Sequence, residues 1–221
     1  MPSIRAARQP NSDRTTEPPT AMPPSTTTTS QPSTSHGQMS GRAGQGAVTQ
    51  PSSSPSGVRI QSPRVFTGGW KEAHELAKAN LEPVFVPVTP FADDRGWSLM
   101  NCLNGVMSAQ GQVNYSLQYP GIVKAWHRQD KQTDFWMCVQ GNVKAGVFRE
   151  ADGAAWMLVT GEKRPGVLII PPPLWHGAAC VGPSPSGLLY YVTHAYDMTK
   201  PDEYRRAWDS VEGFPWMPRN G

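Results

Sequence analysis

From residue 83 onward, the chain is a series of short strand-like segments with almost no helical pattern between them. Turn signals such as ADDRG, EADG, GEKRPG and GPSPSG separate the segments. The segments span residues 84–88, 97–103, 113–119, 122–128, 134–140, 143–149, 155–159, 167–170, 177–181 and 188–194. Many short strands without intervening helices are typical of an antiparallel sandwich or barrel, and they argue against a βαβ fold. The sequence therefore predicts an all-β domain.

Composition divides the chain into two regions. Residues 1–64 contain no Phe, Trp or Tyr and are rich in Ser, Thr, Pro, Gln and Gly. Such a segment cannot bury enough apolar surface to offset the entropy lost on ordering. We therefore expect a disordered tail over 1–64 and one folded domain over 65–221. That domain opens with WKEAHELAKANL, whose apolar spacing predicts a helix over 70–81 that Pro83 ends. Near the other end of the domain, we expect one helical turn over residues 202–206.

Charge and cysteine usage exclude some classes of protein. Six of the 20 basic residues and two of the 17 acidic residues lie in 1–64, so the tail carries about +4 and the remainder about −1. The basic balance thus belongs to the tail, and we expect no nucleic-acid partner. Cys102, Cys138 and Cys180 lack metal-ligand spacing, which favours reduced thiols and a cytoplasmic location. No apolar run is long enough for a membrane span, and the N-terminus lacks a secretory signal core, so we expect no membrane partner.

Two histidines end separate apolar runs. His127 follows Gly121 by six residues, and His176 closes a run that starts at Gly166. Residues two apart on a strand share a face, so His127 and Gln129 can point into one cavity. The two runs therefore predict a polar pocket inside a small barrel.

These runs resemble the two motifs of the cupin superfamily. Within it, ADDRGW (92–97), QVNYSLQYPGIVKAWHRQ (112–129), IIPPPLWHGA (169–178) and LLYYVTHAYD with PDEYRRAWDS (188–210) resemble the dTDP-4-dehydrorhamnose 3,5-epimerase family, over roughly residues 84–213. The resemblance implies a cupin double-stranded β-helix, or jelly-roll barrel, with a short N-terminal helix. It also implies a homodimer without a cofactor that acts on a nucleotide-linked keto-deoxy sugar. Barrels of this family pair through edge strands, and the apolar strands expected around 84–88 and 97–103 are the predicted interface.

The resemblance also implies a set of site residues. The family removes the proton beside a ketone and returns a proton to the other face, which needs a base, an acid and donors to the enolate oxygen. The implied catalytic residues are His127 as base, Tyr190 as acid and Asp209 as the carboxylate that orients His127. The implied substrate-binding residues are Arg95, Asn114, Ser116, Lys124, Gln129, His176 and Tyr196.

This chain departs from the family pattern at three positions. Asp134 stands where the family has a lysine, Ser210 where it has the orienting aspartate, with Asp209 one step earlier, and Lys124 where it has an arginine. The chain is therefore identified as a divergent member, and two other functions stay open. One is a metal-dependent cupin that holds a divalent ion with His127, Gln129, Asp134 and His176, since imidazole, amide and carboxylate are accepted ligands. The other is a non-catalytic cupin that binds a sugar or nucleotide.

Overall fold

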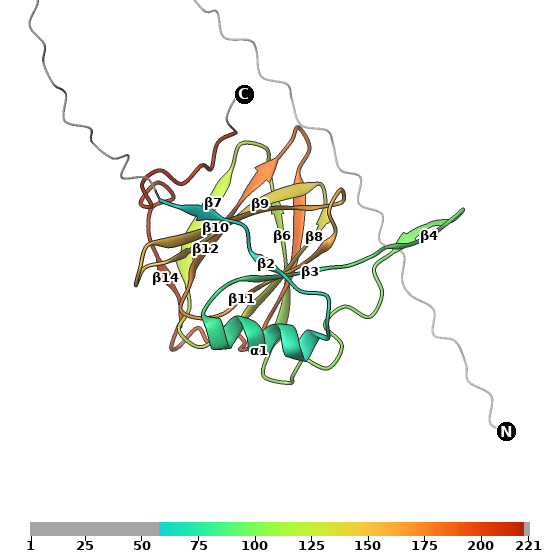
Figure 1. Cartoon of the computed structure of the whole chain (residues 1–221), viewed down its shortest axis with the longest axis horizontal. Helices are drawn as coiled ribbons and strands as arrows, with labels where there is room; N and C mark the ends of the chain where they lie inside the picture. Colours follow the sequence, from blue (N-terminus) through green and yellow to red (C-terminus); the bar gives the residue numbers. More distant parts are fainter. Residues whose placement is uncertain (1–57, 219–221) are drawn as a thin grey trace, which may run out of the picture. The chain divides into compact units, whose positions relative to one another are not determined.

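The computed structural model describes residues 58–218 (Figure 1). In this part of the chain it has one helix, α1 (Trp70–Asn80), and fourteen strands. The strands are β1 (Ile60–Gln61), β2 (Arg64–Val65), β3 (Val84–Pro87), β4 (Phe91–Asp93), β5 (Gly96–Ser98), β6 (Gln112–Gln118), β7 (Val123–Arg128), β8 (Asp134–Gln140), β9 (Asn142–Arg149), β10 (Ala154–Gly161), β11 (Gly166–Ile170), β12 (Trp175–Val181), β13 (Ser186–Val192) and β14 (Tyr204–Arg205).

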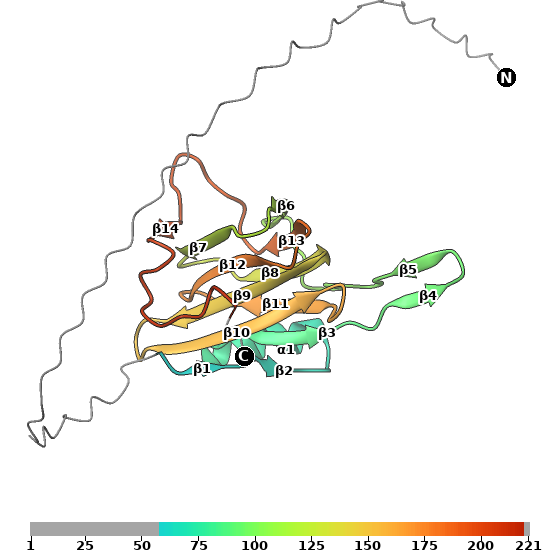
Figure 2. The same ribbon diagram turned by 90° about the horizontal axis from the view of Figure 1, so that it is seen from above.

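Twelve of these strands form two six-stranded sheets that face each other (Figure 2). Sheet A has the order β1-β10-β9-β12-β7-β14, and sheet B has the order β2-β3-β11-β8-β13-β6. Their long strands pair antiparallel, and only the short β1 and β2 pair in parallel, with β10 and β3. The remaining strands, β4 and β5, form a hairpin that projects from the barrel (Figure 1). The predicted all-β class is confirmed.

The main apolar core lies between the two sheets. It includes Phe85, Trp136 and Leu168 of sheet B, each at most 4% exposed. Sheet A contributes Trp156 of β10 and smaller side chains such as Val147 of β9. Because the core fills only part of the space between the sheets, the rest is free to form a cavity.

Helix α1 packs on the outer face of sheet B. Ala73 and Ala77 are fully buried there against Val84 and Val167. The helix ends where Leu81 takes a left-handed backbone conformation, with φ of 51°. Such a residue at a helix C-terminus allows the last carbonyls to be capped. The structure therefore confirms the predicted helix.

Three sequence expectations differ from the structure. Residues 58–64, assigned to the tail, include β1 and β2, which pair with the barrel; the rest of the expected tail, 1–57, lies outside the described residues. The strand expected over 97–103 ends at Ser98, and Asn101 and Leu103 have φ of 57° and 61° in the turns that follow. Residues 202–206, expected to form a helical turn, contain β14 instead.

No helix within residues 58–218 has the length and apolar character that crossing a membrane requires.

Candidate functional site

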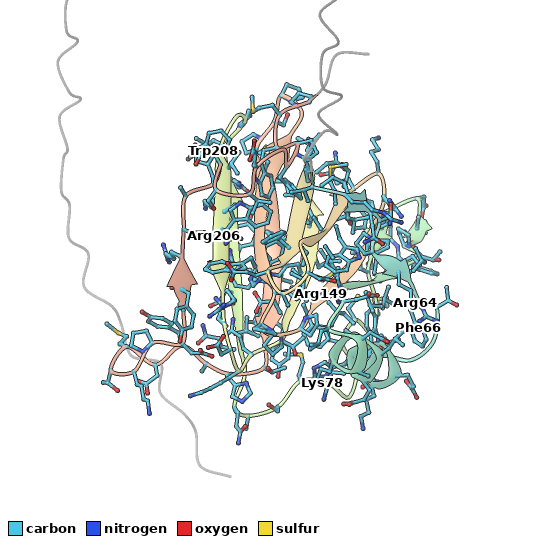
Figure 3. The ribbon with its side chains drawn as sticks, turned by 60° about the vertical axis from the view of Figure 1, so that its left-hand side comes forward. Arg64, Phe66, Lys78, Arg149, Arg206 and Trp208 are labelled. Carbon is cyan, nitrogen blue, oxygen red and sulfur yellow. The ribbon has the colours of Figure 1, made fainter. Side chains whose placement is uncertain are left out.

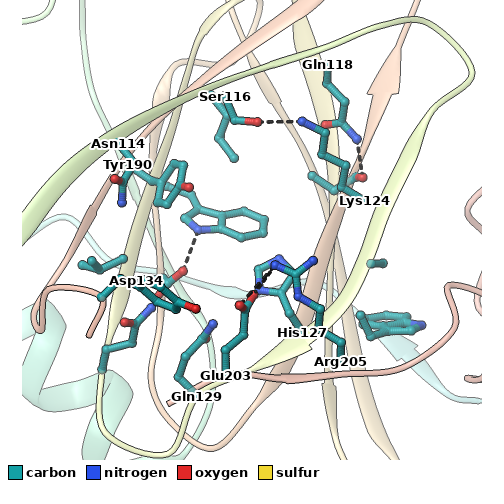
Figure 4. Close-up of a pocket in the computed structure, with 18 of the residues that line it drawn as sticks. Asn114, Ser116, Gln118, Lys124, His127, Gln129, Asp134, Tyr190, Glu203 and Arg205 are labelled. Carbon is teal, nitrogen blue, oxygen red and sulfur yellow. Dashed lines mark hydrogen bonds and ion pairs between the residues drawn. The ribbon is translucent and has the colours of Figure 1, made fainter. Parts of the chain in front are cut away.

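A polar cavity of about 780 Å³ lies inside the barrel, and the C-terminal segment borders it (Figure 4). Strands β6, β7, β8 and β13 supply most of its wall, and residues 202–206 supply a further part. The segment is held in place by Trp126 of β7. The backbones of Trp126 and Arg206 exchange two hydrogen bonds, and the Trp126 indole donates to the Trp208 carbonyl at 2.9 Å. Figure 3 shows Arg206 and Trp208 on this segment beside sheet A.

Strand β6 forms the polar wall because its polar residues face the cavity and its apolar residues face outward, which is the reverse of the usual arrangement in a β-barrel. Its cavity-facing residues are Gln112, Asn114, Ser116 and Gln118. The alternate residues Val113, Tyr115 and Leu117 lie on the outer face and are 52%, 55% and 38% exposed. Successive residues of a strand face opposite sides, so placing the polar residues inside forces the apolar ones outward.

His127 lies on β7 and lines the cavity together with Gln129, as their spacing predicts. Its Nδ1 atom is buried and makes no hydrogen bond with any residue that the structure describes. The ring packs against Trp136 and His176, at ring-centroid distances of 6.0 and 4.3 Å. Burial and the charge of His176 lower the pKa of His127 to about 3, although the carboxylate of Asp134 opposes them. His127 is therefore neutral near pH 7, which is the form that accepts a proton.

His176 lies behind His127 and does not line the cavity. It faces His127 in the register between β12 and β7 and is 3% exposed. Its Nδ1 lies 2.9 Å from the carbonyl oxygen of Leu174, and its Nε2 lies 3.4 Å from Oδ2 of Asp134. The side chain of His176, predicted to bind substrate, therefore contacts His127 and Asp134 and does not line the cavity.

Tyr190 of β13 lines the cavity and is half-buried, beside Asn114 of β6 in the strand register. Burial raises its pKa, and the carboxylates of Asp134 and Glu203 raise it further. Its phenol is therefore protonated near pH 7 and can donate a proton. The neighbouring Tyr191 faces the opposite side and packs with the helix α1 cluster.

The other cavity residues from the predicted set are polar. Lys124 donates to Ser116 Oγ at 2.8 Å and to the carbonyl oxygen of Leu117 at 3.1 Å. Tyr196 also lines the cavity and donates its backbone N–H to the side chain of Gln112. In all, the structure brings seven predicted residues to one cavity: Asn114, Ser116, Lys124, His127, Gln129, Tyr190 and Tyr196.

Two further predicted residues lie away from the cavity. Arg95 lies in the β4–β5 hairpin, where its guanidinium pairs with Asp93 and its side chain is 83% exposed. Asp209 is exposed and does not line the cavity, so it cannot orient His127. The residue before Asp209 explains this: the carbonyl of Trp208 accepts hydrogen bonds from the indoles of Trp126 and Trp216, which fixes the segment on the outer side of sheet A.

The sequence prediction missed four charged residues of the cavity, which all come from the 202–206 segment: Asp202, Glu203, Arg205 and Arg206. Glu203 and Arg205 form an ion pair with each other at 2.9 Å. Register places Arg205 opposite His127, because β14 pairs with β7. The charged run PDEYRR was visible in the sequence, but a helical turn there would not have brought these side chains to the cavity.

The donor set proposed for a metal ion does not fit one. Among the residues described, no three His, Cys, Asp or Glu side chains are grouped so that they could hold a metal. The arrangement explains why: both nitrogens of His176 already face the oxygens of Leu174 and Asp134.

Comparison with proteins of known sequence identifies relatives of this chain, although no family model matches it. The spore coat polysaccharide biosynthesis protein SpsL of Bacillus subtilis (strain 168) is 32% identical over 133 residues, which cover 57% of this chain and 88% of SpsL. The probable low-salt glycan biosynthesis epimerase Agl13 of Haloferax volcanii is 38% identical over 101 residues, which cover 43% of this chain and 65% of Agl13.

Solved structures share the barrel fold. The dTDP sugar isomerase from Desulfovibrio desulfuricans G20 superposes with a TM-score of 0.54 at 20% identity, covering 61% of this chain and 90% of that one. The dTDP-6-deoxy-D-glucose-3,5-epimerase RmlC from Legionella pneumophila Philadelphia 1, in complex with dTDP-4-keto-L-rhamnose, superposes with a TM-score of 0.50 at 16% identity, covering 59% and 76%. These likenesses confirm the double-stranded β-helix expected from the sequence.

Proposed function

We propose that this chain, which belongs to the dTDP-4-dehydrorhamnose 3,5-epimerase-like family of the cupin superfamily, is an epimerase or isomerase of a nucleotide-linked keto-deoxy sugar. The observation that carries the proposal is a neutral histidine, His127, that shares a polar cavity with a protonated tyrosine, Tyr190. The names of Agl13 and of the two solved enzymes, an epimerase, a sugar isomerase and a sugar epimerase, support the same class of reaction.

The proposed reaction is a proton transfer through an enolate. His127 takes the proton from the carbon beside the ketone, and the C–H electron pair moves to the carbonyl oxygen. Tyr190 then gives a proton to the other face of that carbon, and exchange with solvent returns both side chains to their starting forms. A bound diphosphate assists the first step, because its negative charge favours the imidazolium and raises the pKa of His127 from its low value in the empty cavity.

Basic side chains support the proposal of a nucleotide-linked substrate. Lys124 and Arg205 both line the cavity, on β7 and β14. Lys124 is fixed by its bonds to Ser116 and Leu117, whereas the Arg205 side chain is 77% exposed and meets the solvent. We assign the diphosphate to this pair and the sugar ring to the amide-rich wall of β6, because diphosphate needs positive charge and sugar hydroxyls need donors and acceptors.

We further propose that the protein is a homodimer. Apolar side chains gather on the outer face of the edge strand β6 and on the projecting hairpin, where Phe91 and Trp97 are 64% and 54% exposed. An apolar hollow of about 400 Å³ adjoins this face, between β6, β8, β13 and the loop at 99–107. A second copy that covers the face removes it from water. Strand β3, which the sequence suggested as part of the interface, is already buried within sheet B.

The cytoplasm is the location that we propose for this activity. Cys102, Cys138 and Cys180 are all free, as thiols are in a reducing compartment.

Deuterium exchange tests the proposed reaction. A dTDP-linked 4-keto-6-deoxy sugar incubated with the full-length protein in D₂O should gain deuterium beside the ketone, as followed by proton NMR. His127→Gln should slow the exchange at least a hundredfold, roughly the contribution of a general base. The control His194→Gln, an exposed histidine outside the cavity, should exchange at the wild-type rate. If the protein binds the sugar nucleotide but no deuterium is exchanged, the proposed enzymatic activity is refuted and the protein is a non-catalytic binding protein.

A further inference from the structure

Asp134 is the buried acid at the start of β8, next to the proposed base. It is 2% exposed, and its carboxylate accepts hydrogen bonds from Gln132 Nε2 at 2.8 Å and from Trp136 Nε1 at 3.0 Å. Burial alone raises the pKa of a carboxylic acid, but hydrogen bonding and charge from His176, with smaller contributions from His127 and Gln132, lower the pKa of Asp134 overall. Asp134 is therefore a buried carboxylate that its neighbours keep ionised.

His176 is the side chain that faces this carboxylate. A backbone carbonyl can only accept a hydrogen bond, so Nδ1 of His176 donates to Leu174. Nε2 of His176 lies 3.4 Å from Oδ2 of Asp134, without a well-aligned hydrogen bond. Both side chains are buried, so the imidazole and the carboxylate are held against each other.

Asp134 also holds both rings that contact His127. It pairs with His176 and accepts from the Trp136 indole. The ring of His127 packs against these same two rings, edge-on to His176 at 76° and tilted by 37° to Trp136. His127 itself makes no hydrogen bond through Nδ1, so these two packing contacts set the direction of its ring.

We propose that Asp134 is a positioning residue for His127, which it orients through His176 and Trp136. Asp134 touches no reacting atom in this role. The inference rests on the proposed function only for what His127 does; the contacts among these side chains do not depend on a substrate. The other charged groups that line the cavity are Lys124 of β7 and, from the 202–206 segment, Asp202, Glu203, Arg205 and Arg206, of which Glu203 and Arg205 pair with each other.

Imidazole nitrogen NMR on the full-length, ¹⁵N-histidine-labelled protein tests these contacts without any substrate. The ring-nitrogen signals of His127 and His176 should both shift in Asp134→Asn, with the exposed His194 as an unchanged internal reference. His127→Gln and His176→Gln assign the two signals. The control Asp152→Asn removes an exposed carboxylate paired with Arg149 and should leave both signals unchanged. A His127 signal that keeps its wild-type position in Asp134→Asn would overturn the proposal that Asp134 orients the ring.

Exchange kinetics test the positioning role. Asp134→Asn should lower kcat for deuterium exchange by about tenfold to a hundredfold, the size expected for a misplaced base, with KM within about twofold of wild type. Asp152→Asn should match the wild type in both constants. Wild-type kcat in Asp134→Asn would refute the positioning role even if the NMR signals shift. If Asp134→Asn does not fold, Trp136→Phe, which removes only the indole contact to Asp134, replaces it in both tests. Trp136→Phe should then shift the His127 signal and lower kcat in the same direction. Absence of exchange in the wild type would instead reject the proposed function and leave the NMR result standing.

Discussion

His127 should make the folded protein sensitive to mild acid, and His127→Gln should remove part of this sensitivity. In the folded state, burial and the charge of His176 hold the pKa of His127 at about 3, whereas in the unfolded chain it has its ordinary value of 6.5. Between these values the unfolded chain binds a proton that the folded chain excludes. Stability therefore falls as the pH drops below 6.5, and the loss continues until the pH approaches 3.

The size of the effect follows from the two pKa values. From pH 7.5 to pH 5, a histidine shifted from 6.5 to about 3 removes about 2 kcal/mol from the free energy of unfolding. Glutamine does not titrate, so His127→Gln lacks this contribution but keeps those of the other groups. Subtracting the change measured in the variant from the change in the wild type thus isolates His127.

Urea unfolding at the two pH values measures this difference. The wild type should lose about 2 kcal/mol more than His127→Gln between pH 7.5 and pH 5. Equal losses in the two proteins would show that His127 titrates normally in the folded state. The inference that it is a buried neutral base would then fail, whatever the exchange assay gives.

Three further results are expected. Lys124→Met should raise KM for a dTDP-linked substrate about tenfold and change kcat little, because it removes a diphosphate contact that lies away from the reacting carbon; an unchanged KM would show that Lys124 does not bind the substrate. Val113→Glu, on the outer face of β6, should shift the protein from dimer to monomer in light scattering, whereas Val159→Glu, a similarly exposed residue on sheet A, should not. A chain that begins at Pro63 lacks β1 and should melt several degrees below one that begins at Val58, because β1 pairs with β10; equal melting temperatures would mean that this pairing contributes nothing.

The barrel and its principal cavity residues could be predicted because they depend on local patterns. Alternation along β6 and the spacing of His127 and Gln129 follow from strand geometry alone, and both His127 and Asn114 line the cavity. Helix α1 could also be predicted from a local pattern, since its apolar spacing and the proline after it are enough to define it. Each of these predictions needed only one segment of the chain.

The errors come from residues whose environment is set by distant parts of the chain. Asp209 lies one residue after Trp208, whose carbonyl is held by two indoles from elsewhere in the sequence, and no local pattern reveals that anchor. Segment 202–206 has residues compatible with a helical turn, but pairing between β14 and β7 overrides that tendency. Arg95 lies in a turn, as expected, but the β4–β5 hairpin projects from the barrel and carries Arg95 away from the cavity of its own chain.

The inverted pattern of β6 links the cavity to the proposed interface. Asn114 and Ser116 face the cavity, while Val113, Tyr115 and Leu117 face outward from the same seven-residue strand. A shift of this edge strand by one residue would bury the apolar set in the cavity and expose the polar one. Among residues 58–218 of one chain, β6 pairs only with β13, so a single partner strand holds its register. A second copy packed on the outer face adds the contacts that the free edge lacks, so dimerisation and an ordered substrate wall should be gained or lost together.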